Sequence, residues 1–326
     1  MPSTLFDNPP DVVQADINSL CQALDQNLPG KQPDRNLLIA TWNIRAFGSL
    51  TRKWTAASSD NPKRDKRGLF AIIEIVKRFD VVGIQEVTGD LRALRELMAA
   101  LGDDWSFLMT DVNLGAAGHN ERMAFVFDNR RVKLSGLACE LVVPPEWLGE
   151  TGAEALNRQF ARTPYAVSFR AGDTTFIMVS LHIDYGDDSA ERVPELYGIA
   201  RWMADWAKKT TSWDHNLITL GDFNIDRWGS GLWQAFTSTG LVVPEKLQTV
   251  PRSIFADPND PMGDKYYDQI AWFANPSTGI PLLSMTCTNA GYFDFLPYVY
   301  TDANLSKSSI SYRISDHYPL WAEFSI

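Results

Sequence analysis

Hydrophobic runs that end in a polar side chain recur along this chain. The polar residues at the ends of five such runs are Asn43, Glu86, His182, Asp222 with Asn224, and Asp316 with His317, and a sixth run, YYDQIAWF, contains Asp268. Because buried strands bring their ends together at one edge of a sheet, we expect these side chains to converge. An oxygen-rich site with two histidines suits a hard divalent cation and the cleavage of a phosphate ester.

The periodicity of the apolar positions predicts strands interleaved with helices. Strands are expected at about 37–43, 80–86, 122–128, 165–170, 174–183, 216–221, 267–273, 283–288 and 317–325, and helices at about 11–28, 68–79, 90–101, 189–209 and 230–239. The segments YAVSFR and TTFIMVSLHI flank the short turn AGD and are typical of a hairpin rather than a crossover. The sequence therefore predicts an α/β fold with mixed sheets.

The first predicted helix precedes every chemical motif. It follows Pro9-Pro10 and is separated from the first strand by the turn-rich segment GKQPDRN. We therefore expect residues 1–36 to form a helix and linker appended to a main domain at 37–326. A polar loop from Ser49 to Arg67 is too long for a simple connection, which predicts a functional or mobile segment.

The chain is acidic, with a formal net charge of -10 over 326 residues, of which 45% are hydrophobic. This balance disfavours a protein that grips nucleic acid through overall positive charge, but it leaves nucleic acid open as a substrate. The basic residues Lys63, Arg64, Lys66 and Arg67 form either a local steering patch or a solvated loop.

The three cysteines lie far apart, so the sequence indicates neither a zinc site nor a disulfide framework, and their odd number favours a reducing compartment. The first residues have no basic start and no apolar core of a signal peptide, and no apolar stretch approaches the length of a membrane span. We expect a soluble, cytoplasmic protein. The sequence carries no signal of its oligomeric state.

Glu86 follows a mostly apolar run, where an unpaired buried carboxylate would cost several kcal/mol. A metal ion would compensate this charge, and a surface ion pair at an exposed strand end is the alternative. In GDFN, Asp222 and Asn224 are two residues apart, so in extended chain both side chains project from one face. The carboxylate is suited to hold an attacking water and the amide to hold a phosphoryl oxygen, and a simple Asx turn is the alternative.

His182 and His317 are two of only four histidines in the chain. A catalytic imidazole needs an acidic neighbour that fixes its tautomer, and Glu121 and Asp268 are the candidates. A single histidine is more often a structural hydrogen-bonding residue. The two together, with the acids around them, favour acid-base catalysis.

Eight short motifs in a fixed order carry a family resemblance: TWNIR, IQEV, NERMAFVF, FARTPY, SLH, GDFN, YYDQI and ISDHYPL. From about residue 37 to the end, the chain resembles the endonuclease/exonuclease/phosphatase superfamily of DNase I-like metal-dependent phosphoesterases. The resemblance implies a four-layer α/β/β/α sandwich of two mixed β-sheets with the active site at one rim. His119 departs from the pattern, since DNase I-like nucleases carry a tyrosine there.

The resemblance also implies residue roles. Glu86, Asn43 and Asp316 are similar to the residues at the metal, and Asn43, Asn224 and Arg162 to those that contact the substrate phosphate. Glu121 and Asp268 resemble the acids that orient His182 and His317, and Asp222 resembles the acid that holds the water. The implied cofactor is Mg²⁺ or Mn²⁺, with Ca²⁺ as an additional candidate.

These expectations combine into a divalent-metal-dependent phosphodiesterase, a DNase I-like nuclease that hydrolyses phosphodiester bonds by in-line attack of water on a nucleic-acid substrate. The alternatives are a sphingomyelinase-like phospholipid phosphodiesterase or a phosphomonoesterase of the same superfamily, and a catalytically inactive scaffold. The aromatic segment GYFDFLPYVY is suited to stacking bases, touching lipid or packing in the core, of which packing is favoured. The loops Ser49–Arg67 and Pro251–Lys265 are expected to determine the substrate.

Overall fold

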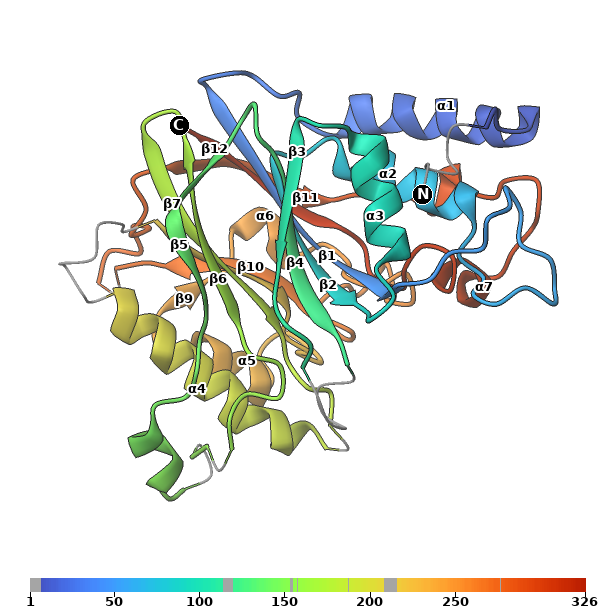
Figure 1. The fold of residues 1–326 in the computed structure, drawn as a ribbon. Coiled ribbons are helices and arrows are strands. Elements are labelled where there is room, and N and C mark those ends of the chain that lie inside the picture. Colours follow the sequence, from blue (N-terminus) through green and yellow to red (C-terminus); the bar gives the residue numbers. More distant parts are fainter. Residues whose placement is uncertain are drawn as a thin grey trace.

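The computed structural model describes residues 7–113, 120–152, 155–156, 158–186, 188–207, 216–275 and 277–326. His119 lies outside this range, as do the last two residues of the helix expected at 189–209. Within the described part, two sheets are stacked face to face and helices cover their outer faces (Figure 1). The expected four-layer α/β/β/α arrangement of mixed sheets is confirmed.

The first sheet has six strands among the described residues, in the order β11-β12-β1-β2-β4-β3. They are β1 (Asn36–Phe47), β2 (Val81–Val87), β3 (Trp105–Met109), β4 (Arg122–Asp128), β11 (Thr286–Tyr292) and β12 (Leu320–Ser325). Strands β1 and β2 are parallel, whereas the other neighbours are antiparallel. Strand β1 is buried over nearly its whole length because both faces of the sheet are covered.

The second sheet also has six strands in the described part, in the order β5-β6-β7-β8-β10-β9. They are β5 (Lys133–Glu140), β6 (Tyr165–Ala171), β7 (Thr174–His182), β8 (Leu217–Asp222), β9 (Leu241–Val242) and β10 (Asp268–Phe273). Strands β6 and β7 form the expected hairpin, and β7 and β8 are parallel.

Alternation along the strands decides which side chains meet between the sheets. Leu37 and Ile39 of β1 belong to the core shared with the second sheet, whereas Leu38 and Ala40 face the helices on the other side. Gly83 of β2 lies against Leu220 of β8, and a Cβ atom at that glycine would stand 2.6 Å from the leucine side chain. The same alternation turns Asn43 of β1 and Asp222 of β8 toward the space between the sheets, where they share a hydrogen bond.

The long helices form the two outer layers. Helices α1 (Asp11–Asn27), α2 (Lys66–Val76) and α3 (Arg92–Leu101) share a core with the outer face of the first sheet, and α4 (Ser189–Ala207) and α5 (Gly231–Thr237) cover the second (Figure 1). Short helical turns occur at η2 (Pro145–Gly149), α6 (Glu245–Gln248), η3 (Leu296–Tyr298) and α7 (Lys307–Ser311). Helix α1 packs on α2 and η3. The division of the chain at residue 37 remains a proposal.

The basic residues at 63–67 are neither a steering patch nor a solvated loop, because three of the four are buried. The Arg64 guanidinium donates hydrogen bonds to backbone carbonyls at the end of β1 and in the segment that leads into β12. Arg67 pairs with Asp16 of α1 and with Asp302. These charges hold separate segments together.

The aromatic segment at 291–300 runs from the end of β11 through η3, and most of its rings pack in the core, as the sequence favours. Phe293, Phe295 and Tyr300 are buried in the core beneath the outer face of the first sheet, and Phe295 contacts Trp42 and Tyr318. These rings are not available to a substrate.

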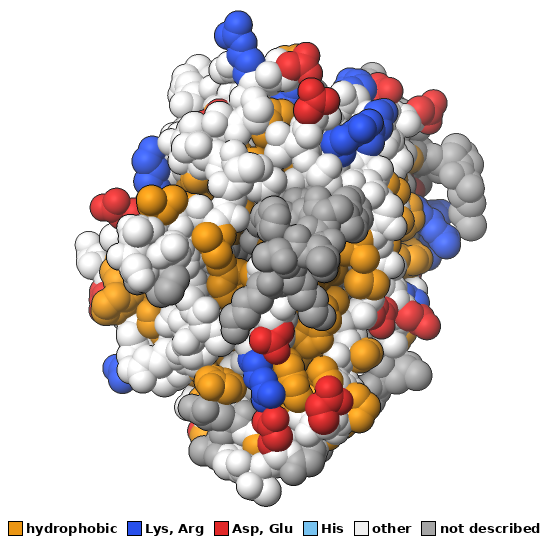
Figure 2. All heavy atoms as spheres, turned by 90° about the vertical axis from the view of Figure 1, so that its left-hand side faces the viewer, with side chains coloured by type: hydrophobic (Ala, Val, Ile, Leu, Met, Phe, Trp, Pro, Cys, Tyr) orange, Lys and Arg blue, Asp and Glu red, His pale blue; other side chains and the backbone are white. Residues whose placement is uncertain are grey.

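The chain ends at the left of Figure 1, where β12 finishes, so the polar ends of β1 and β2 lie at the opposite end of the sheets. The face on that left-hand side shows hydrophobic side chains among acidic and basic groups that stand singly or in small clusters (Figure 2). No helix in the described part combines the length and hydrophobicity that a membrane crossing requires.

Candidate active site

The strand registers bring the predicted polar residues of the second sheet side by side. In the parallel pair β7–β8, His182 stands opposite Asp222, and in the antiparallel pair β8–β10, Asp268 stands opposite the same residue. Asp268 is the first residue of its strand, not an interior residue as expected. Because paired residues project from the same face of a sheet, three of the predicted side chains share one edge.

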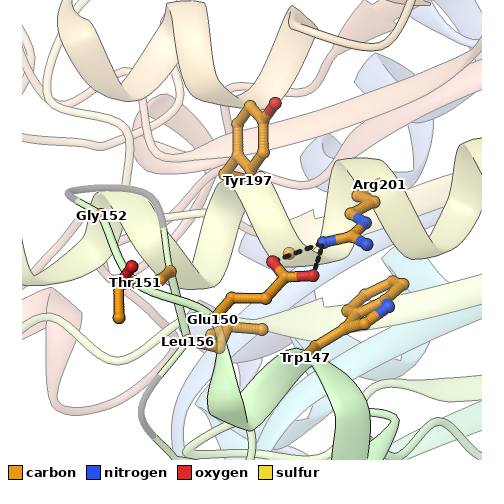
Figure 3. Close-up of a pocket in the computed structure, with 9 residues that line it drawn as sticks. Trp147, Glu150, Thr151, Gly152, Leu156, Tyr197 and Arg201 are labelled. Carbon is orange, nitrogen blue, oxygen red and sulfur yellow. Dashed lines mark hydrogen bonds and ion pairs between the residues drawn. The ribbon is translucent and has the colours of Figure 1, made fainter.

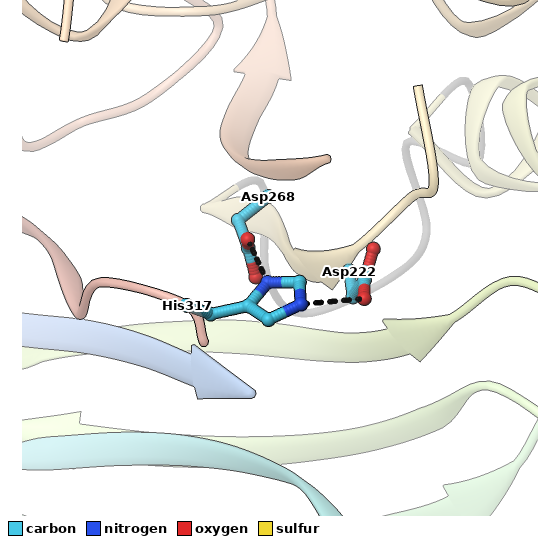
Figure 4. A group of neighbouring side chains, drawn as sticks. All are labelled: Asp222, Asp268 and His317. Carbon is cyan, nitrogen blue, oxygen red and sulfur yellow. Dashed lines mark hydrogen bonds and ion pairs between the residues drawn. The ribbon is translucent and has the colours of Figure 1, made fainter. Parts of the chain in front are cut away.

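Two imidazoles converge on Asp222. The Nε2 atom of His182 lies 3.8 Å and that of His317 lies 3.9 Å from the Oδ2 atom of Asp222. His317 comes from the loop before β12, in the first sheet, and Figure 4 shows its ring between Asp268 and Asp222. The cluster therefore joins the two sheets.

Hydrogen bonds fix the Asp222 carboxylate from both sheets. Asn43 of β1 donates from Nδ2 to Oδ2 at 2.9 Å, and the backbone N–H of Asn224 donates to Oδ1 at 2.9 Å. Burial raises the pKa of this carboxyl, but the two imidazoles and these donors outweigh burial, so the pKa of Asp222 lies below its ordinary value. The carboxylate is therefore ionised and accepts hydrogen bonds at neutral pH.

His317 is held by a second buried acid. Its Nδ1 atom lies 2.6 Å from Asp268 Oδ2. Burial raises the pKa of Asp268 to about 6, and the imidazole opposes that rise. Burial lowers the pKa of His317, but the carboxylates of Asp268 and Asp222 outweigh it and raise this pKa well above the ordinary value. The pair retains a proton on the imidazole, with Nε2 directed toward Asp222.

His182 has a looser acidic partner. Its Nδ1 atom lies 3.2 Å from Glu121 Oε2 but forms no aligned hydrogen bond. Arg162 donates from Nε to the same carboxylate oxygen at 2.8 Å. Arg162 is thus the partner of Glu121 in the site, and its contact with a substrate phosphate remains a prediction.

Backbone strain marks the strand ends at this edge. Glu86, Ala46 and Asn224 adopt φ values of 61°, 44° and 48°, a region that non-glycine residues seldom occupy. The β1–β2 register shifts between Asn43 and Phe47, so a bulge redirects the chain there. Position 221 requires glycine, because a Cβ atom there would stand 2.0 Å from the Leu181 carbonyl oxygen.

The predicted metal residues come from the first sheet. Asn43 Oδ1 is buried and has no hydrogen-bond partner within the described structure. Glu86 is half-buried and accepts from the backbone N–H of Ala46 at 2.7 Å, and Asp316 lies 3.6 Å from the Arg45 guanidinium. An orphaned buried amide oxygen on β1, with Glu86 on the neighbouring strand β2 and Asp316 in the loop before β12, fits a hard cation, which prefers oxygen ligands.

A second set of possible ligand atoms overlaps with the acid-base group. One ligand atom each from Asp222, Asp268 and His317 lies within 4.8 Å of the others. Because Asp268 already engages Nδ1 of His317, this trio has the arrangement of a histidine with its orienting acid. That Glu86, Asn43 and Asp316 hold the ion, and not this trio, remains a prediction.

Several supporting residues escaped the sequence patterns. Ser315 donates from Oγ to the Asn43 carbonyl at 2.6 Å and accepts from the backbone N–H of His317 at 3.0 Å. Arg192, from α4, donates to the Asn224 carbonyl and pairs with Asp226. Ser315 stands within the ISDHYPL motif, which offered a signal, whereas Arg192 gave none because its partner lies 32 residues away in the chain.

Asn224 has its side chain committed in this structure. Its Nδ2 donates to the Ile183 carbonyl at 2.6 Å. The amide is therefore anchored next to Asp222, and its contact with a phosphoryl oxygen remains a prediction.

A separate cavity of about 410 Å³ lies between η2 and α4 (Figure 3). Arg201 lines this cavity, but its Nη1 atom lies 2.8 Å from Glu150 Oε2 and its guanidinium carbon lies 4.1 Å from the Trp147 ring centroid. Its charge is thus compensated, and none of the clustered catalytic candidates lines this cavity.

Comparison with known proteins places the chain. A sequence model of the "Endonuclease/Exonuclease/phosphatase family" matches residues 40–317. A Deoxyribonuclease from Thioalkalivibrio sp. (strain K90mix) is 28% identical over 301 residues, which are 89% of this chain and 71% of that protein. Deoxyribonuclease-1 from Bos taurus is 26% identical over 302 residues, which are 87% of this chain and 91% of that protein.

Solved structures share the fold. The crystal structure of an endonuclease/exonuclease/phosphatase family protein from Bacteroides thetaiotaomicron superimposes with a TM-score of 0.57 at 21% identity, over 91% of this chain and 99% of that one.

Proposed function

The chain belongs to the endonuclease/exonuclease/phosphatase family and is a phosphoester hydrolase, and from this membership we propose that it is a divalent-metal-dependent nuclease that hydrolyses phosphodiester bonds in nucleic acid. The convergence of two imidazoles on the ionised Asp222 is the observation that carries the proposal. Two acid-base groups around one carboxylate suit a reaction in which one oxygen loses a proton and another gains one.

The names of the relatives favour nucleic acid over the alternative substrates. Two relatives that align with most of this chain are called deoxyribonucleases. The inositol phosphatase branch of the resembled superfamily usually carries Trp-Cys before the acid that corresponds to Asp268, whereas this chain has Tyr-Tyr there and resembles the nuclease branch more closely. In the aromatic segment that offered a lipid contact, Phe293, Phe295 and Tyr300 are buried, which weakens the argument for a phospholipid substrate.

In the proposed reaction, Asp222 accepts a hydrogen bond from the attacking water and orients its oxygen toward phosphorus. His182 takes the proton of that water as the new P–O bond forms. Asp268 accepts from Nδ1 of His317 and favours the protonated imidazolium, which donates its Nε2 proton to the leaving oxygen as the old P–O bond breaks. Water and phosphodiester thus give a phosphomonoester and an alcohol, and the protons balance between the two imidazoles.

The remaining residues hold and position. Asn43 donates one amide N–H to Asp222 and Asn224 donates one to the Ile183 carbonyl, and in this proposal the second N–H of each amide contacts the substrate phosphate. Arg162 donates to Glu121, which lies next to His182. Glu86, Asp316 and the orphaned Oδ1 of Asn43 would hold Mg²⁺ or Mn²⁺. A bound divalent cation supplies positive charge that stabilises the negative charge developing on the phosphoryl group.

A side-by-side substrate panel tests this function. Supercoiled plasmid DNA, sphingomyelin vesicles and inositol phosphates are supplied with Mg²⁺ and, as a control, with EDTA. We expect nicking of the plasmid that EDTA abolishes and that His317→Ala lowers by about 100- to 10,000-fold. Faster turnover of sphingomyelin or of an inositol phosphate than of plasmid would contradict the nuclease assignment and favour the corresponding alternative.

A further inference from the structure

Exposed aromatic side chains gather at the edge that carries the catalytic cluster. In the described part of the chain, the exposed aromatic residues are Phe107, Tyr185, Trp228, Phe255 and Tyr312. All except Phe107 lie in loops that follow β7 or β8 or that lead into β10 or β12. Since β7 and β8 end at Asp222 and its neighbours, and β10 and β12 begin there, four of the five rings surround one rim.

Tyr185 is fixed in place although 53% of its surface is exposed. Its ring stands edge-on to the Tyr267 ring, with 6.4 Å between the two ring centroids. The centroid of the Tyr267 ring lies 5.7 Å from that of the His317 ring. The Arg192 guanidinium lies 4.6 Å from the Tyr185 centroid and is itself anchored by Asp226. Protein groups therefore support this ring, while much of its surface stays open to solvent.

Tyr312 is supported in the same manner on the side of the first sheet, and 53% of it is exposed. The Arg45 guanidinium lies 4.0 Å from its ring centroid. Arg45 is held by Ser311 at 2.9 Å and by Asp316 at 3.6 Å. One guanidinium thus links this ring to an acid beside His317.

We propose that Tyr185 and Tyr312 are stacking platforms for nucleobases on the two sides of the scissile phosphate, and that the preferred substrate is single-stranded nucleic acid. The inference rests on the proposed nuclease function and narrows its substrate class. An exposed ring stacks on any base whose face is open, whereas the base faces of a duplex are covered by their neighbours. A pre-positioned ring also loses little conformational entropy when a base binds.

The acidic net charge of the chain supports recognition of a nucleic-acid strand through base stacking on tyrosine rings. Its formal net charge is -10, and Arg64, Lys66 and Arg67 are buried in ion pairs or hydrogen bonds. Few basic groups of this segment remain to neutralise phosphates, so we expect the KM for a strand to rise only weakly with salt. Stacking needs only an open base face, and every base has one.

The test compares strands with and without bases. The substrates are a 12-nucleotide oligothymidylate, the same backbone built from abasic tetrahydrofuran units, a 12-base-pair duplex, and methyl p-nitrophenyl phosphate, all with Mg²⁺. The proteins are wild type, Tyr185→Ala, Tyr312→Ala and the conservative variants Tyr185→Phe and Tyr312→Phe. Phe107→Ala is the control, because this exposed ring lies on β3, outside the loops of the rim.

We expect wild type to cleave the base-bearing strand faster than the duplex or the abasic strand. Each Tyr→Ala change lowers kcat/KM on the base-bearing strand by about 5- to 150-fold and on the abasic strand by clearly less, and each Tyr→Phe change restores most of the loss. Phe107→Ala follows wild type on every substrate.

Equal losses on the base-bearing and abasic strands, or a wild-type preference for the duplex, would overturn the inference while leaving the nuclease assignment in place. Failure of wild type to hydrolyse methyl p-nitrophenyl phosphate and every oligonucleotide would remove the proposed function, and the stacking inference with it.

Discussion

His317 Nδ1 lies 2.6 Å from Asp268 Oδ2, with both side chains buried at the edge of the two sheets. The two residues are 49 positions apart; Asp268 begins β10 of the second sheet and His317 lies in the loop that leads into β12 of the first, so the stacking of the sheets brings them together. The contact sets the tautomer of the imidazole and leaves Nε2 for chemistry at Asp222.

Removing this imidazole is predicted to lower kcat by about 100- to 10,000-fold, since a positioned acid-base group contributes that much. Asp268→Asn keeps the shape of the acid but loses its charge, so a smaller loss is expected. Steady-state kinetics with a metal-dependent substrate checks both variants, and circular dichroism confirms that they fold. Near-normal turnover by folded His317→Ala would contradict the assignment.

His182 is predicted to contribute as much to kcat as His317 does, whereas its acidic neighbour Glu121 is predicted to contribute less than Asp268. His182→Ala falls in the same range of about 100- to 10,000-fold. Glu121→Gln loses less activity than Asp268→Asn, because Glu121 forms no aligned hydrogen bond with His182 and already accepts from Arg162. Measured kcat values of the two acid variants decide the order, and the reverse order would show that the Glu121 contact tightens when substrate binds.

The dependence of activity on Mg²⁺ distinguishes the predicted metal ligand Glu86 from Asp268, the acid that orients His317. We expect Glu86→Gln to raise the Mg²⁺ concentration needed for half-maximal activity by about 10-fold or more, and Asp268→Asn to leave it within about threefold of wild type. Titration calorimetry with Mn²⁺ gives a readout independent of turnover. If Asp268→Asn weakened Mn²⁺ binding and Glu86→Gln did not, the trio of Asp222, Asp268 and His317 would be the metal site instead.

Glu195 makes stability depend on pH. This buried residue of α4 accepts from the Ala161 N–H at 3.1 Å, and burial raises its pKa to about 7. The folded state therefore binds the proton more tightly than the unfolded state, whose carboxyl has an ordinary pKa near about 4.3. Stability from this group is complete below that value, declines as pH rises, and levels off above about 7.

Urea unfolding of wild type and Glu195→Gln across this range checks the sign. We expect the wild type to lose about 3 kcal/mol relative to the glutamine variant between pH 4 and pH 8. A wild type that gained stability relative to the variant as pH rose would show that a neighbouring cation compensates the charge in the folded protein.

The buried strands and the residues at their ends could be predicted from sequence, because long apolar runs leave few other conformations for segments such as the one before Glu86. Strands β3 and β5 and the two-residue strand β9 were missed. Strand β5 lies at the edge of its sheet, half exposed and interrupted by Gly136, so its hydrophobic pattern is weak. Strand β11 was expected at 283–288 and lies at Thr286–Tyr292 for the same reason.

Contacts between side chains that lie far apart in the sequence could not be predicted. The cluster at 63–67 has the composition of a solvated loop, but Arg64 is buried because carbonyls from two distant segments surround it. Likewise, the sequence assigned Arg162 to a substrate and gave no sign that Glu121 lies 2.8 Å away. Exposure of Tyr185 and Tyr312 is also a tertiary property, since aromatic residues in a sequence are more often core.

Turnover of supercoiled plasmid DNA by wild type and Asp222→Asn, with Mg²⁺ and with EDTA, tests the central claim most directly. Asp222 is the point where both imidazoles and Asn43 meet, and asparagine preserves its size without its charge. We predict Mg²⁺-dependent nicking by wild type and a loss of about 1,000-fold or more in the folded variant. A folded Asp222→Asn protein that nicks plasmid at the wild-type rate would contradict the account.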